Sequence, residues 1–232
     1  METEIQQVEQ NSEADPVKGK EVTTKRGTTP PLNFLAILND ANKLIKASSP
    51  DELCDKLYAG VFLEPNALKY FVDEKFNKNC FIVFARKLLI SWAENPDYWK
   101  WTKEKDVSGE DIEVAELSKV CWLNIEGTIQ TIYLSPGTVY EVVFVVKMKD
   151  EGICNMRNFS MTLTIIFPRS KSLTRSANLK EKPLGTWIEI LVGEFTMLPE
   201  NVGDISFKLG EYSSDWKKGL VVKCATIRPK NY

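Results

Sequence analysis

The chain has 232 residues, of which 43% are hydrophobic, and its formal net charge at pH 7 is −2. A near-neutral charge excludes the strongly basic surface by which many proteins recruit nucleic acid or anionic membranes. The sequence contains no histidine, which removes the usual general base, the commonest metal ligand and any histidine-activated nucleophile. These features argue against an enzyme, and no motif calls for a cofactor.

The first 32 residues predict a disordered tail, because they are polar, end in two prolines and lack periodic apolar residues. Met1–Asp15 has no apolar run, so we expect no secretory signal, and no segment approaches the roughly 20 apolar residues of a membrane span. We therefore expect a cytoplasmic protein without membrane insertion. In a reducing compartment its scattered cysteines, which form no C-x-x-C pair, are expected to be buried thiols: Cys54, Cys80, Cys121, Cys154 and Cys224.

Residues 33–60 predict a short helical extension. A first helix is indicated by apolar residues at helical spacing, namely Phe34, Ile37, Leu38, Ala41, Leu44 and Ile45. A second helix has a clear start signal, with Ser49 as N-cap, Pro50 at the first helical position and Glu52 completing a capping box. Gly60 can end this helix with a positive φ.

From residue 61 to residue 232 the pattern is that of short strands. Residues 159–167 and 205–209 alternate apolar and polar side chains with a period of two, which is typical of half-buried strands. Apolar segments predict further strands at 80–90, 120–125, 139–148, 187–192 and 220–227. We therefore predict a mainly β domain, an antiparallel β-sandwich of jelly-roll-like form.

The densest chemical feature is segment 91–101, in which aromatic residues surround a turn-favouring Asn-Pro-Asp sequence. A turn is usually exposed, and an exposed indole can pack on the C–H face of a pyranose while keeping an N–H to donate. Trp92 and Trp99 are therefore the first candidates for a sugar-stacking platform. Additional candidates are Asn95, Tyr98 and Trp101, although Trp101 fits a core position better.

Stacking alone is not selective, so a sugar site also needs oriented acceptors such as carboxylates. Asp204 and Glu211 lie at the two ends of one predicted strand, and Glu189 and Glu194 form a second pair. For any single acid, a solvated surface charge is the ordinary alternative. Paired acids also suggest a glycosidase, but no hydrolase motif accompanies them.

Two further groups of residues have simpler interpretations. A polar stretch between two strands carries bases that could contact phosphate, but a solvated loop is the better prediction: Arg169, Lys171, Arg175, Lys180 and Lys182. The remaining tryptophans lie inside or beside strand patterns and are predicted to belong to the core: Trp122, Trp187 and Trp216.

Several segments in the same order resemble the phloem lectins (phloem protein two), whose domain also occurs in the tobacco agglutinin Nictaba. The resemblance covers about residues 61–232 and is specific, because the matching segments are long and collinear. They are 80–86 (CFIVFAR), 90–92 (ISW), 95–101 (NPDYWKW), 113–117 (EVAEL), 120–125 (VCWLNI), 134–138 (LSPGT), 140–142 (YEV), 187–190 (WIEI), 192–195 (VGEF), 216–219 (WKKG) and 227–229 (IRP).

The resemblance implies a β-sandwich that binds N-acetylglucosamine oligomers and the chitobiose cores of N-glycoproteins. The site of the tobacco lectin, two tryptophans and two late carboxylates, matches Trp92, Trp99, Asp204 and Glu211. Asp204 stands where the family has a glutamate, so its shorter arm reaches less far. The resemblance also implies a homodimer found in phloem companion cells and sieve-tube sap.

Three classes of function therefore stay open at the level of sequence. The favoured one is a lectin. The second is a phloem interaction protein whose main partner is RNA or phloem filament protein, against which the near-neutral charge counts. The third is a glycosidase, which would have to release reducing ends from a chitin oligomer.

Overall fold

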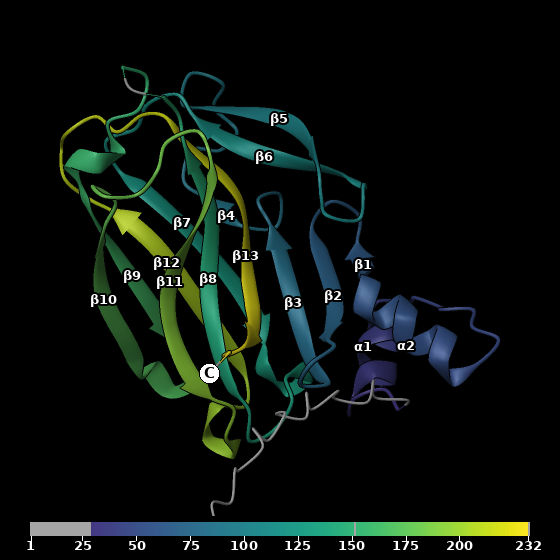
Figure 1. Ribbon diagram of the computed structural model, residues 1–232. Helices are drawn as coiled ribbons and strands as arrows, with labels where there is room; N and C mark the ends of the chain where they lie inside the picture. The colour runs from purple at the N-terminus through teal and green to yellow at the C-terminus, as the bar shows by residue number, and fades with distance from the viewer. Residues whose placement is uncertain (1–28, 151, 232) are drawn as a thin grey trace, which may run out of the picture.

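The computed structural model describes residues 29–150 and 152–231. Within them, two antiparallel sheets pack face to face, and the helices α1 (Phe34–Asp40) and α2 (Pro50–Ala59) lie at one edge of the molecule (Figure 1). This arrangement confirms the predicted antiparallel β-sandwich with two short helices before it. The first 28 residues of the predicted tail lie outside the described part of the chain.

The larger sheet is organised around β13 (Leu220–Pro229), which pairs with strands on both of its edges. On one edge it pairs with β3 over Cys224–Ile227 and with β6 at Val221 and Val222, and on the other edge it pairs with β8. The other strands of this sheet are β1 (Val61–Glu64), β2 (Leu68–Asp73), β3 (Lys78–Phe84), β5 (Trp99–Lys105), β6 (Asp111–Leu117), β8 (Val139–Met148) and β11 (Trp187–Thr196).

The smaller sheet runs in the order β10, β9, β12, β7, β4 and covers one face of the larger sheet (Figure 1). Its strands are β4 (Leu89–Ile90), β7 (Leu123–Gln130), β9 (Ser160–Ile166), β10 (Ser172–Asn178) and β12 (Asp204–Glu211). Short 3-10 turns connect several strands, namely η1 (Thr131–Tyr133), η2 (Met156–Asn158), η3 (Pro168–Ser170) and η4 (Pro199–Asn201).

The core lies between the two sheets and follows from the period of two along the strands. In β12, Ile205, Phe207 and Leu209 are fully buried, while the residues between them face outward. The ring of Phe207 packs edge-on against Phe144 of β8, with 5.9 Å between ring centroids. Each such aromatic side chain contributes about 1.5–3 kcal/mol by leaving water.

The strands predicted from apolar patterns are largely confirmed. Segment 139–148 is β8 with the same bounds, and the alternating segments lie in β9 and β12. Segment 80–90 is instead divided, because a turn at Ala85–Leu88 separates β3 from β4. Five strands lie outside the predicted segments: β1, β2, β5, β6 and β10.

The basic stretch predicted as a solvated loop contains the strand β10, so that prediction was wrong for Ser172–Asn178. Among the described residues this strand pairs with β9 alone, at the edge of the smaller sheet, and its side chains are exposed on both faces except for the half-buried Ala177. An edge strand exposed on both faces has no reason to alternate apolar and polar residues, so the sequence pattern carried no signal.

The second helix forms as predicted, and the first is shorter. Glu52 donates its backbone N–H to Ser49 Oγ at 3.1 Å, and Gly60 ends α2 with φ +87°. The first helix ends at Asp40, before a left-handed Asn42 (φ +51°), so Leu44 is 91% exposed. The predicted helical contact of Leu44 was therefore wrong.

Residues 29–32, which we expected in the tail, are held against the turn between β2 and β3. Pro31 is buried, the carbonyl of Thr29 accepts from Asn77, and the carbonyl of Leu32 accepts from Asn79. The chain is therefore anchored to the sandwich a few residues earlier than its composition indicates.

All five cysteines are free thiols. Cys54, Cys80 and Cys224 are buried, as predicted, and burial raises the pKa of Cys224 to about 12. Cys121 and Cys154 are only half-buried.

A buried ion pair ties β2 to the turn between β5 and β6. Lys69 Nζ lies 2.7 Å from Asp106 Oδ2 and 2.8 Å from Ser108 Oγ, and the two charged side chains are 3% and 4% exposed. Asp106 also accepts the backbone N–H groups of Ser108 and Glu110. Burial by itself would raise the pKa of Asp106, but these hydrogen bonds outweigh it and the pKa lies below its usual value.

We predict that Asp106→Ala lowers the free energy of unfolding by about 3 kcal/mol, because it leaves the Lys69 ammonium buried without a counter-charge. Urea denaturation followed by tryptophan fluorescence measures this loss. The matched control is Asp111→Ala in the same hairpin, whose ion pair with Lys105 has side chains 62% and 65% exposed. That variant should lose less than about 0.5 kcal/mol, and equal losses in the two variants would contradict the prediction.

Candidate functional site

The aromatic turn that follows β4 places one tryptophan in solvent. Trp92 has a left-handed backbone (φ +68°) and is 60% exposed. Its carbonyl accepts the N–H of Asn95, whose side chain accepts the N–H of Asp97 at 2.9 Å. The Tyr98 ring packs edge-on against Trp92, with 6.3 Å between ring centroids. Asn95 therefore shapes the turn, and Trp92 and Tyr98 present aromatic surface.

Trp99 does not take the position that we expected for a stacking residue. It is the first residue of β5, is 2% exposed, and donates its indole N–H to the carbonyl of Ser91 at 3.0 Å. Neither face of its ring is open to a ligand, so the expectation of an exposed Trp99 was wrong. Its ring supports the turn from the core side because β5 pairs into the larger sheet at this residue.

Trp101 is half-buried, in keeping with the core position that we favoured. Its indole N–H donates to the carbonyl of Ala93 at 3.2 Å, and the guanidinium of Arg86 lies 3.7 Å from its ring centroid. Arg86 therefore covers one face of Trp101, where the cation–π contact stabilises the pair by about 0.5–2 kcal/mol.

Two tryptophans that we predicted in the core are exposed instead. Trp122 is 56% exposed just before β7, and Trp216 is 55% exposed just before β13. The apolar neighbours of Trp122 made it resemble a buried strand residue. Trp216 follows Ser213-Ser214-Asp215, a polar turn sequence that was the available signal of exposure.

These side chains gather around one small cavity. Its volume is about 210 Å³, and its walls include Trp92, Tyr98, Trp122 and Trp216. We call this the aromatic pocket. Tyr212 extends its surface, because its ring contacts Trp122 with 4.7 Å between centroids. The fold thus brings together aromatic residues from three loops that lie far apart in the sequence.

Gly210 gives Tyr212 its place on the outer face of the smaller sheet. A Cβ atom at Gly210 would lie 2.1 Å from the Tyr212 hydroxyl oxygen, so only a glycine lets the ring lie against β12 here. From this position the hydroxyl donates to Asn124 Oδ1 at 3.0 Å. The ring is therefore fixed at both its edge and its hydroxyl.

A buried lysine connects the loops that carry these aromatics. The Lys217 side chain is fully buried, forms an ion pair with Glu211, and donates to the carbonyls of Cys121 and Ser213. Burial lowers the pKa of Lys217. Hydrogen bonds to the surrounding oxygens compensate for this desolvation. They also connect Cys121, which precedes Trp122, to Ser213 in the turn before Trp216.

Glu211 is therefore close to the aromatic pocket but mostly engaged in the protein. Its side chain is 13% exposed, and it accepts from the backbone N–H and the hydroxyl of Ser213. This carboxylate keeps the loop in place and retains little surface for a ligand.

The structure does not bring Asp204 to the same place. In the register between β12 and β7, Asp204 lies opposite Gln130 and Glu211 lies opposite Leu123. The two acids are therefore at opposite ends of β12. Seven residues of strand separate them by about 23 Å, and an odd separation directs their side chains to opposite faces of the sheet. Only Glu211 lies at the end of the strand that carries the aromatic pocket.

The second pair of acids is engaged in ion pairs on the larger sheet. Glu189 pairs with Arg228 at 2.5 Å and Glu194 pairs with Lys230 at 2.6 Å. Arg228 also contacts Glu141 at 2.7 Å. These acids therefore brace neighbouring strands, and they lie outside the aromatic pocket.

Fold and site together define a β-sandwich with an open aromatic pocket. The family model described as Phloem protein 2 matches residues 78–229. The chain is 41% identical over 202 residues to "Protein PHLOEM PROTEIN 2-LIKE A1" of Arabidopsis thaliana, covering 86% of this chain and 81% of the relative. The chain belongs to the phloem protein 2 family.

Another relative is named simply a lectin. It comes from Luffa acutangula and is 37% identical over 180 residues, covering 77% of this chain and 84% of its own length. Among solved structures, the CBM22-1 xylan-binding domain from Paenibacillus barcinonensis Xyn10C shows only a faint likeness, with 9% identity over 65% of this chain and 86% of that domain and a TM-score of 0.34. No helix in the described residues is long and apolar enough to cross a membrane.

We predict that Lys217→Met lowers the free energy of unfolding by about 3 kcal/mol, because Glu211 and two carbonyls lose their buried partner. Guanidinium denaturation monitored by circular dichroism measures the change. Lys218→Met is the control, since this neighbouring side chain is exposed and, within the described part of the chain, donates only to the carbonyl of Gly152, at 3.4 Å. It should change stability by less than about 0.5 kcal/mol, and a Lys217→Met protein as stable as this control would refute the role of the buried lysine.

Proposed function

We propose that this chain is a lectin that binds N-acetylglucosamine oligomers at the aromatic pocket. The observation that carries the proposal is the exposure of Trp92, Trp122 and Trp216 around one cavity. Leaving three indoles in water forgoes stabilisation of about 1.5–3 kcal/mol for each, and such exposed apolar groups mark binding surfaces. The lectin among the relatives supports the same conclusion.

The chemistry of the pocket suits a chain of pyranoses. Trp92 supplies a stacking face for the apolar side of one sugar ring, and Trp122 and Trp216 supply the walls for its neighbours. Tyr98 and the indole N–H groups supply hydrogen-bond donors, while Glu211 holds the loop that carries Trp216 through Lys217 and Ser213. Trp99 supports the turn from within and contributes no stacking surface.

We further propose that the protein binds its ligand without cleaving it. Glycosidases hold two carboxyl groups about 5–9.5 Å apart across the scissile bond. Asp204 and Glu211 lie about 23 Å apart along β12, and Glu189 and Glu194 are held by Arg228 and Lys230. These two candidate pairs therefore give no support to a glycosidase.

The biological setting that we propose follows from the family. Relatives are named phloem proteins, and we propose that this chain acts in the cytoplasm of phloem companion cells and in sieve-tube sap. A homodimer would present two aromatic pockets to one glycan-bearing surface. Because a single shallow site is weak, the second pocket would raise the overall affinity through avidity.

We predict that Trp92→Ala reduces the affinity for chitotriose at least tenfold, on the scale of about 1–3 kcal/mol for an aromatic contact, while the fold stays intact. Isothermal titration calorimetry measures the affinity, and circular dichroism checks the fold. Trp122→Ala and Trp216→Ala should weaken binding in the same direction. Trp187→Ala is the matched control, because this tryptophan packs beside Lys147 on the larger sheet. Loss of binding in Trp187→Ala with unchanged binding in Trp92→Ala would refute the assignment.

We predict that the affinity for chitotriose changes less than about twofold between roughly 50 and 500 mM NaCl, because stacking on a neutral sugar releases no counterions. A filter-binding titration with single-stranded RNA over the same salt range provides the comparison. The bases of the 169–182 stretch are spread along the edge of the smaller sheet and not gathered at the aromatic pocket. Tight RNA binding with a steep salt dependence, together with no chitotriose binding, would replace the lectin by the interaction protein.

A further inference from the structure

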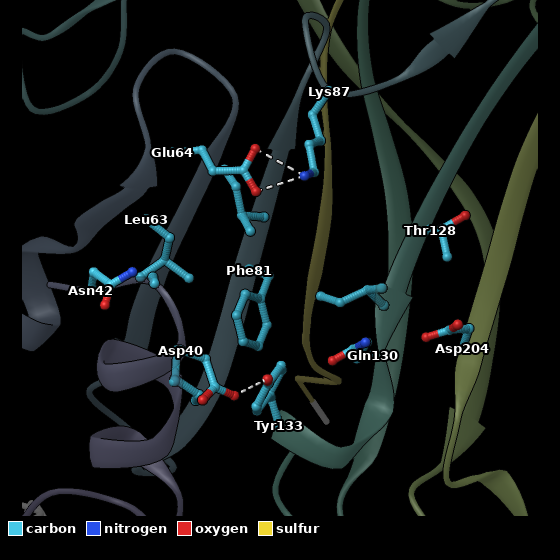
Figure 2. Close-up of a pocket in the computed structure, with 14 residues that line it drawn as sticks. Asp40, Asn42, Leu63, Glu64, Phe81, Lys87, Thr128, Gln130, Tyr133 and Asp204 are labelled. Carbon is cyan, nitrogen blue, oxygen red and sulfur yellow. Dashed lines mark hydrogen bonds and ion pairs between the residues drawn. The ribbon is translucent and has the colours of Figure 1, made fainter.

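A second and larger cavity lies where the helical extension meets the sandwich. Its volume is about 590 Å³, and it is bounded by α1, β1, β3, β7 and the first residue of β12 (Figure 2). α1 and β1 precede the segment that matches the family model, residues 78–229. We call this larger cavity the junction cavity. It lies at the opposite end of β12 from the aromatic pocket.

The inner lining of the junction cavity is apolar. Ile37 of α1, Leu63 of β1, Phe81 of β3 and Ile129 of β7 all line it and are all buried. A cavity of this size with an apolar floor and a few polar groups at its rim is the usual form of a small-molecule site. The floor therefore fits an apolar body.

The rim of the junction cavity carries an excess of negative charge. Its charged residues are Asp40, Glu64 and Asp204 against the single base Lys87. Lys87 pairs with both oxygens of Glu64, at 2.6 and 2.9 Å, and Asp40 accepts the hydroxyl of Tyr133. Two carboxylates thus remain without a counter-ion among the described residues that line the cavity.

Asp204 is the better placed of these two acids. Its carboxylate has no hydrogen bond or ion pair with another residue in the described part of the chain, and Figure 2 shows it turned toward Gln130 on the side of the cavity. A carboxylate beside an apolar floor forms its strongest interaction with a hydrogen-bond donor that is itself charged.

We propose that the junction cavity binds a small amphipathic organic cation. Its apolar body packs on Ile37, Phe81 and Ile129, and its ammonium group donates hydrogen bonds to Asp204. One feature favours a cation over a neutral sugar, namely the negatively charged rim. This site is independent of the proposed lectin site.

The test is a calorimetric titration of the full chain with 2-phenylethylammonium and with 2-phenylethanol, which has the same body without the charge. The ammonium should bind saturably and the alcohol about tenfold more weakly, as expected for one charge-assisted hydrogen bond. Asp204→Asn should weaken the ammonium about tenfold and leave the alcohol unchanged. Asp215→Asn, an exposed acid at the other end of the molecule, is the matched control and should change neither affinity.

A second variant tests the floor independently of charge. Ala41→Leu at the C-cap of α1 adds bulk to the lining and should weaken both probes, with the fold checked by circular dichroism. Absence of saturable binding, equal affinity for the two probes, or an unchanged affinity in Asp204→Asn would each overturn the proposal. Loss of ammonium binding in Trp92→Ala would also overturn it, because the probe would then occupy the aromatic pocket.

Discussion

In β12 the side chains of Ile205, Phe207 and Leu209 lie between the two sheets, and this alternation decides where the neighbouring side chains point. The period of two places Gly210 on the outer face, where Tyr212 covers it. It also sends Asp204 and Glu211 to opposite faces, although both belong to one strand. The packing of the two sheets thus separates the two acids of a single strand, because Asp204 lines the junction cavity and Glu211 binds the buried Lys217.

The aromatic pocket depends on a polar network as much as on its rings. Trp92, Trp122 and Trp216 come from three separate loops, and exposed loops by themselves have many conformations. The buried Lys217 limits this freedom because its ammonium bonds to Cys121, to Ser213 and to Glu211. A residue that does not line the aromatic pocket can therefore determine how the residues that do line it are arranged.

The helical extension adds a second feature to the family domain. α1 and β1 close one side of the junction cavity, while Asp204 and Ile129 of the sandwich close the other. Such a cavity can be lost or altered by changes in the extension alone, without any change in the aromatic pocket. Relatives that differ in this region would share the sandwich but not the second cavity.

The sequence by itself determined the class of fold and the family. Alternating residues in 159–167 and 205–209, the cap at Ser49 and the collinear motifs are local signals, and they led to the correct sandwich. Local signals also located the aromatic turn around Trp92. They failed for β10, because an edge strand exposed on both faces leaves no periodic pattern.

Only the tertiary structure decided which aromatic residues reach solvent. Trp99 lies seven residues after Trp92 in the same segment, yet it is buried because β5 starts there and joins the larger sheet. Trp122 is exposed although apolar residues flank it in sequence, and Trp216 is exposed beside a strand although its pattern indicated a core position. Burial depends on what packs against a residue from distant parts of the chain, and a single sequence records only its neighbours along the chain.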